Sequence, residues 1–162
     1  MRKLTMVGGT AAAALVVITG LTVAPAGGAS VRTIRVYEHD TTQASLDLGE
    51  KGDSPGDRFI YSGDLFDKKG GKNVGRAAGN CETVSVGSAH AESVCTVNLI
   101  LAGGHIIGQG VGNTAEIFGG KTVPFAIVGG TGVYRNARGD GTVTVPTDVP
   151  NLTDAIFAVR LR

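Results

Sequence analysis

Residues 31–40 read VRTIRVYEHD, an alternation of apolar and polar side chains that is typical of a β-strand with one buried face. Side chains alternate between the two faces of a strand. One face therefore carries Ile34, Val36, Glu38 and Asp40, and the other carries Arg35, Tyr37 and His39. If the two aliphatic side chains face a core, two carboxyl groups follow them inward.

A carboxyl group in an apolar interior is costly to ionise, so its pKa rises toward the range that suits general acid or base catalysis. We therefore consider Glu38 and Asp40 as catalytic residues. The alternative is that the strand ends near Glu38 and that both acids lie in solvent. The two interpretations are balanced for Glu38, and the solvent interpretation is favoured for Asp40.

The rest of the chain shows the same kind of pattern, in short alternating runs separated by Gly, Asp, Asn or Pro. The further strands predicted are 58–66, 73–86, 91–101, 105–111, 123–128, 139–145 and 153–161. The connections leave no room for crossover helices, which excludes a parallel sheet. Eight antiparallel strands form either a sandwich or a closed β-barrel, and only closure leaves no unpaired edge. We expect a barrel, with residues 40–55 as a polar loop at its mouth.

Charge and composition limit the partners. The 162 residues include 15 Lys and Arg against 14 Asp and Glu, which does not indicate nucleic acid as a partner. Three histidines are scattered over three segments, so no metal site is expected. An eight-stranded barrel is wide enough to hold one small ligand, and we expect a hydrophobic small molecule.

Residues 1–29 have the features of a secretory signal peptide, with two basic residues, an apolar run and then small residues. Cleavage is expected after Ala26 or Ala29, leaving residues 30–162 as a secreted domain without a membrane anchor. The alternative is a retained anchor, but the apolar run is interrupted and falls short of the roughly 20 residues that a spanning helix needs.

The two cysteines, Cys81 and Cys95, fall on consecutive predicted strands. A hairpin that turns near Ser88 places them opposite one another, at a spacing that suits a disulfide. An oxidising compartment also favours this bond. The alternative is that Cys81 is a free catalytic thiol.

Four segments stand out along the chain: VYEHD at 36–40, GDRFIYS at 56–62 with LFD at 65–67, VGRAAGNC at 74–81, and VGGTGVY at 128–134 with ARG at 137–139. Together they resemble segments of plant dirigent proteins and allene oxide cyclases. The resemblance keeps its order over nearly the whole mature chain. It implies an eight-stranded barrel with a hydrophobic pocket that works without a metal or a bound cofactor, in families that steer cyclisation of a reactive lipid or coupling of phenolic radicals.

The resemblance also implies roles for particular residues. Glu38 matches the cyclase glutamate that polarises the substrate, Asp40 matches the first-strand aspartate of dirigent proteins, and Arg138 matches the arginine after the glycine turn. Relatives of this kind suggest a homo-oligomer, either a trimer or a dimer. The binding residues expected are Ile34 and Val36, on the face of the first strand that carries Glu38, together with Tyr61 and Gly63 on the second strand.

Three functions remain open from the sequence. The first is a cofactor-independent cyclase or isomerase, or a dirigent-like protein, in which Glu38, Asp40 and Arg138 stabilise developing charge. The second is a non-catalytic, lipocalin-like carrier of an apolar ligand. The third is a structural exported domain with a filled core.

Overall fold

The structure is a computed structural model that describes residues 31–87, 90–148 and 153–162. The expected signal peptide, residues 1–29, lies outside the described residues. The strands are β1 (Arg32–Leu46), β2 (Arg58–Phe66), β3 (Asn73–Val86), β4 (Ala91–Leu101), β5 (Gly104–Asn113), β6 (Thr122–Gly130), β7 (Gly139–Thr144) and β8 (Asp154–Leu161).

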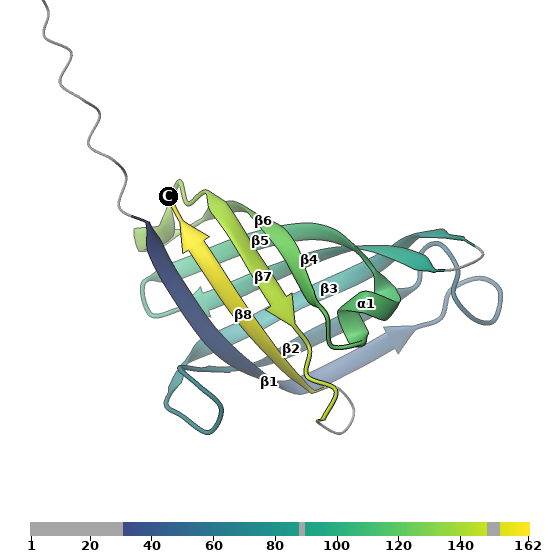
Figure 1. The fold of residues 1–162 in the computed structure, drawn as a ribbon, viewed down its shortest axis with the longest axis horizontal. Coiled ribbons are helices and arrows are strands. Elements are labelled where there is room, and N and C mark those ends of the chain that lie inside the picture. Colours follow the sequence, from purple (N-terminus) through teal and green to yellow (C-terminus); the bar gives the residue numbers. More distant parts are fainter. Residues whose placement is uncertain (1–30, 88–89, 149–152) are drawn as a thin grey trace, which may run out of the picture.

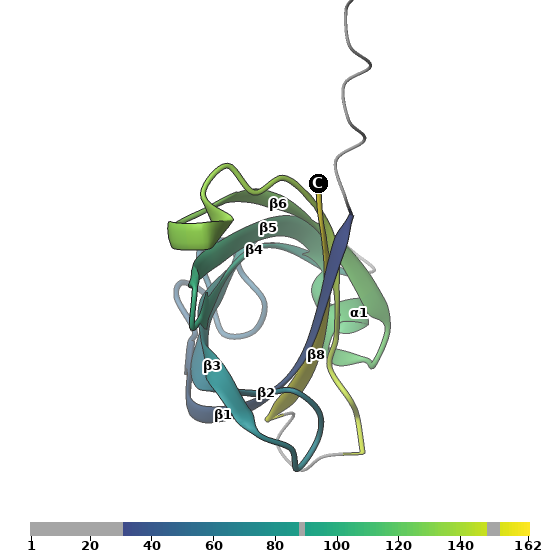
Figure 2. The same cartoon turned by 90° about the vertical axis from the view of Figure 1, so that its left-hand side faces the viewer.

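The strands form one closed antiparallel barrel in sequence order, which confirms the predicted fold class. Each strand pairs with the next along the chain, and β8 pairs with β1 to close the cylinder. Figure 1 shows the cylinder from the side, and Figure 2 shows its strands around a ring. The sandwich alternative is therefore excluded.

The first strand is longer than predicted. Residues 40–46 were expected to begin a loop, but β1 continues to Leu46 and pairs with β2 as far as Arg58. The register shifts between Asp40 and Thr42, which leaves Thr41 as the extra residue of a β-bulge. The bulge breaks the alternation in the sequence, and this is why the strand seemed to end there.

A short helix, α1 (Thr114–Phe118), connects β5 to β6 and has no counterpart among the predicted elements. Asn113 caps it, because its side-chain oxygen accepts hydrogen bonds from the amides of Ala115 and Glu116 at 2.8 and 3.3 Å. The helix lies at the end of the barrel away from the C-terminus (Figure 1). Within the described part of the chain, no helix is long and apolar enough to cross a membrane.

Inward-facing side chains fill one part of the barrel completely, and we call this part the packed end. Leu65 and Val159 are fully buried there, and Leu99 and Ile106 are each only 1% exposed. The other members of this buried cluster include Val36, Ala77, Ile127, Tyr134, Ala137 and Leu161. The packed end stabilises the barrel through apolar burial and leaves the other end for a site.

The disulfide predicted between β3 and β4 is confirmed. Cys81 and Cys95 are directly opposite in the register, their Cα atoms are 4.0 Å apart, and their sulfur atoms are bonded. Both cysteines have inward-facing positions. The alternative of a free catalytic thiol at Cys81 is therefore wrong.

Candidate functional site

A cavity of about 80 Å³ occupies the other end of the barrel, which we call the hollow end. Its walls are mainly aromatic and aliphatic, and the Cys81–Cys95 disulfide forms part of them. Ile117 and Phe118 of α1 also line it, so that the helix closes one side. The aromatic side chains of the hollow end are Phe59, Tyr61, Phe118, Phe125 and Phe157.

Inward-facing glycines determine the shape of this cavity. A Cβ atom at Gly108 would lie 2.5 Å from Cε2 of Phe125, and one at Gly141 would lie 2.6 Å from the same atom. The Phe125 ring can therefore lie against the walls of β5 and β7 only because both positions lack a side chain. The ring then packs edge to face on Phe157, with centroids 6.3 Å apart.

Glu38 lies in this interior and is the most buried of the charged residues, with 1% of its surface exposed. Burial is the main cause that raises its pKa to about 9, and the negative charge of Asp40 and a hydrogen bond with it add to the shift. Glu38 therefore keeps its proton at neutral pH. The expectation that this side chain follows Ile34 and Val36 inward is correct.

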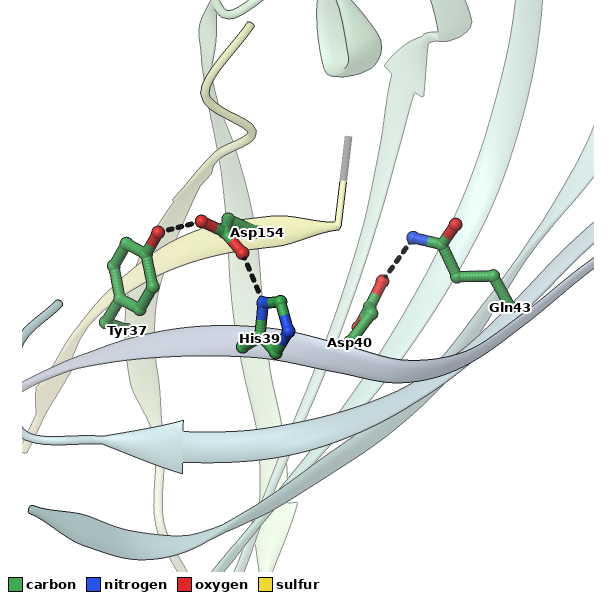
Figure 3. A network of polar contacts seen from close by, with 5 residues as sticks. All are labelled: Tyr37, His39, Asp40, Gln43 and Asp154. Atoms are coloured by element: carbon green, nitrogen blue, oxygen red, sulfur yellow. Dashed lines mark hydrogen bonds and ion pairs between the residues drawn. The ribbon is translucent and has the colours of Figure 1, made fainter. Parts of the chain in front are cut away.

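Asp40 also faces inward, and the pKa of its carboxyl group is raised, mainly by burial. Hydrogen bonds from Gln43 and Glu38 act in the opposite direction and favour its ionised form. Gln43 Nε2 donates to Asp40 Oδ2 at 2.7 Å (Figure 3). The bulge at Thr41 returns Gln43 to the inner face, three residues beyond Asp40.

Glu38 and Asp40 therefore act as a pair. Within the described part of the chain, Glu38 Oε1 and Asp40 Oδ1 are the buried side-chain oxygens without a donor partner. The negative charge of Asp40 and a hydrogen bond with it raise the pKa of Glu38, so the two carboxyl groups are coupled. The pair can donate a proton from Glu38 and accept one at Asp40.

Tyr61 of β2 lines the cavity close to this acid pair. Burial first, and then the negative charges of Glu38 and Asp40, raise the pKa of its hydroxyl group well above the ordinary value. The hydroxyl group is therefore protonated throughout the physiological range. It is a second donor that can act on a bound molecule.

A second polar cluster lies behind the acid pair, on the opposite face of β1. Tyr37 and His39 both hydrogen-bond to the carboxylate of Asp154, the first residue of β8, and the His39 Nδ1 to Asp154 Oδ1 distance is 2.7 Å (Figure 3). Burial raises the pKa of Asp154, but the hydrogen bonds from Tyr37 and His39 outweigh it, so the pKa is lowered. This cluster ties β1 to β8 where Glu38 is held.

The structure divides the expected binding residues between the two ends of the barrel. Tyr61 lines the cavity. Val36 is buried in the packed end, and Ile34 packs against the same cluster, so neither lines the cavity. Gly63 pairs with Asp40, and a Cβ atom there would lie 2.8 Å from Asp40 Cα. Gly63 therefore allows β1 and β2 to approach closely beside the acid pair.

The structure does not bring Arg138 to the acid pair. Arg138 precedes β7, is exposed, and donates from Nη1 to the carbonyl of Ala137 at 2.8 Å. The next residue, Gly139, pairs with Leu161, whereas Glu38 pairs with Ala155. Six residues of β8 separate these levels, which is about 20 Å. Arg138 is therefore not part of the candidate site.

Two parts of the site, Gln43 and helix α1, were not predicted from the sequence. Gln43 was assigned to a loop because the bulge concealed the strand, and nothing in the local sequence marks the bulge. Helix α1 did leave a signal, since Asn113 precedes it and Gly119 and Gly120 follow it, which is typical of the two ends of a helix.

Comparison with solved structures supports the fold. A pyocyanin demethylase is 26% identical, with a TM-score of 0.68 over 81% of this chain and 100% of that chain. The Diels-Alderase AbmU from Streptomyces koyangensis is 20% identical, with a TM-score of 0.69 over 82% of this chain and 63% of that chain. A pterocarpan synthase dirigent protein is 18% identical, with a TM-score of 0.61 over 82% of this chain and 83% of that chain.

No curated protein matches this chain. The family model for the allene oxide cyclase barrel like domain matches residues 33–154, which include every strand from β1 to β7 and the start of β8. The chain therefore belongs to the allene oxide cyclase barrel like domain family.

Proposed function

We propose that this protein binds a hydrophobic, conjugated small molecule in the hollow end and steers its cyclisation or stereoselective coupling. The observation that carries the proposal is the buried, protonated Glu38 beside Asp40 at the edge of an apolar cavity. The structural similarity to Diels-Alderases and dirigent proteins supports the same class of reaction.

The chemistry follows from the two donors and the dry walls. Glu38 donates its proton as a hydrogen bond to a carbonyl oxygen of the bound molecule, and Tyr61 supplies a second donor. Such hydrogen bonds withdraw electron density from a conjugated acceptor and are stronger in a site without water. The aromatic walls hold the reacting carbons close together, and this lowers the entropic part of the barrier.

The acid pair favours catalysis over the carrier function. Burying two carboxyl groups in an apolar cavity is costly, and a carrier of an apolar ligand gains nothing from them. The demethylase among the similar structures indicates that a barrel of this fold can support other reactions as well. Its reaction belongs to that protein and does not enter this proposal.

Export to an oxidising compartment is part of the proposal. The Cys81–Cys95 disulfide supports it, because such bonds persist mainly outside the reducing cytosol. The leader-like composition of residues 1–29 points the same way. The mature protein is then residues 30–162.

The test compares product profiles in the source organism. The gene is deleted and then restored as wild type, or as the double variant Glu38→Gln/Asp40→Asn, which keeps the side-chain volumes. Wild type is expected to restore a cyclised or coupled product in one stereochemical form, and the double variant is expected to lose it. The variant's circular dichroism and intact disulfide establish that it is folded. An identical product profile for the folded double variant and wild type contradicts the proposal.

A further inference from the structure

The acidic side chains of the cavity have no Lys or Arg beside them. Glu38 and Asp40 face it, the Asp154 carboxylate is turned to Tyr37 and His39 on the other face of β1, and no Lys, Arg or His is among the described residues that line the cavity. The basic side chains nearest to Glu38 along β1, Arg35 and His39, are on the outer face of that strand. Elsewhere Arg58 pairs with Glu82 on the outside of the barrel, at 2.9 Å.

The partners of the three carboxyl groups show where the charge remains. The Asp154 carboxylate is already satisfied by Tyr37 and His39. Asp40 accepts a hydrogen bond from the neutral amide of Gln43, and Glu38 Oε1 and Asp40 Oδ1 have no hydrogen-bond partner. Buried charges in proteins are normally paired. Among the described residues that line the cavity, no Lys or Arg pairs with these carboxyl groups.

The aromatic walls of the cavity favour a flat, positively charged ligand. Phe59 and Tyr61 stack with ring centroids 5.9 Å apart, and Phe118 meets Phe59 edge to face at 5.3 Å. The faces of aromatic rings attract cations, and they also stack on other flat rings. A carboxylate that enters this cavity loses its hydration and meets neither a cation nor a cluster of donors.

We propose that the hollow end selects flat aromatic ligands that carry a delocalised positive charge, such as N-alkylated nitrogen heteroaromatics, and rejects aromatic carboxylates. The ligand would serve as the missing counter-ion of the Glu38–Asp40 pair. The inference rests on the proposed function, because it assumes that the cavity binds a small molecule, and it adds the charge class of that molecule.

Three two-ring probes of similar size test the inference: 1-methylquinolinium as the cation, quinoline as the neutral molecule and 1-naphthoate as the anion. Their dissociation constants are measured at pH 7.5 by protein-detected NMR titration. We expect 1-methylquinolinium to bind wild type about tenfold more tightly than 1-naphthoate, with quinoline between them.

The matched variants separate the local charge from the overall charge. Glu38→Gln/Asp40→Asn removes two carboxyl groups from the cavity and is expected to bring the cation to anion ratio close to one. Glu50→Gln/Asp53→Asn removes two carboxyl groups from the exposed loop between β1 and β2, and it should keep the wild-type ratio. If the first double variant does not fold, Asp40→Asn alone takes its place.

The outcomes distinguish this inference from the proposed function. Binding of 1-naphthoate to wild type as tight as that of 1-methylquinolinium, or an unchanged ratio in the cavity variant, overturns the charge selectivity and leaves a binding cavity. If none of the three probes binds the cavity, small-molecule binding itself is contradicted, and the inference is contradicted with it.

Discussion

At the scale of single residues, Glu38 is the most informative side chain. It lies on the inner face of β1, is almost completely buried, and has a pKa raised to about 9 by burial and by Asp40. The unfolded chain ionises a glutamate near pH 4.5. Between these two values the folded protein binds one more proton than the unfolded chain, so the contribution of Glu38 to stability is complete below pH 4.5 and falls as the pH rises through about 9.

The pH dependence of unfolding tests this assignment. For wild type, the free energy of unfolding should decrease from pH 5 to pH 9, and the part of the slope due to Glu38 is at most about 1.4 kcal/mol per pH unit, the limit for one proton. Asp40 contributes with the same sign at the acidic side of this range, since its pKa is also raised. Glu38→Gln should flatten the curve. The measurement is urea unfolding at one-unit pH intervals.

Glu50→Gln is the control for this series. Glu50 is exposed in the loop between β1 and β2, and its removal should leave the slope as in wild type. A wild-type stability that rises with pH over the same interval is the result that the buried, protonated Glu38 does not allow.

At the scale of elements, α1 forms one side of the cavity, and we expect it to influence access. Ile117 and Phe118 line the hollow end, and Phe118 meets Phe59 of β2 edge to face. The helix has only five residues, so packing rather than helix propensity holds it in place. An element with so few contacts opens more easily than the strands around it.

Phe118→Ala is therefore expected to speed ligand exchange. The substitution removes the aromatic contact with Phe59, which is worth about 1 kcal/mol, and widens the opening beside α1. The association and dissociation rates of 1-methylquinolinium should rise together, severalfold each, as measured by NMR line-shape analysis. The dissociation constant should change less than either rate.

Lys121→Ala provides the matched control. Lys121 forms an exposed ion pair with Glu116 of α1 at 2.7 Å, and exposed pairs of this kind contribute little. Exchange rates that respond to Lys121→Ala as strongly as to Phe118→Ala would show that general loosening of the helix, rather than the Phe118 ring, controls access.

At the scale of the whole molecule, the barrel combines a packed end that provides stability with a hollow end that provides the site. Each strand runs through both ends of the barrel. Neighbouring inward positions on one strand therefore differ in how much their packing contributes to the free energy of unfolding. On β8, Val159 is fully buried in the packed end, whereas Phe157 lines the cavity. Glu38 lies between the two ends on β1, two residues beyond Val36.

Two valine substitutions on adjacent strands measure this difference. Val159→Ala removes two methyl groups from a site without free volume and should cost about 2 kcal/mol. Val143 of β7 is partly buried and lines the cavity, so Val143→Ala should cost about half as much. Urea unfolding at one pH compares them. Equal costs would mean that the hollow end is packed as tightly as the other.

The antiparallel barrel and the Cys81–Cys95 disulfide were predicted from the sequence, whereas the inward direction of Glu38 was one of two balanced interpretations. Each depends on the period of two within a strand or on hairpin pairing, and these are local properties that the order of residues specifies. The bounds of β2, β3 and β4 agree with the predicted ranges for the same reason.

Only the tertiary structure decided which inward residues line a cavity and which fill a core. Val36 and Glu38 have the same alternation, yet one packs in the cluster and the other lines the cavity, because different side chains from the other strands meet them at the two ends of the barrel. The bulge at Thr41 turns the Gln43 side chain inward, where it donates a hydrogen bond to Asp40. The length of β8 separates Arg138 from the Glu38–Asp40 pair. Such relations arise between strands far apart in the chain, where local alternation carries no information.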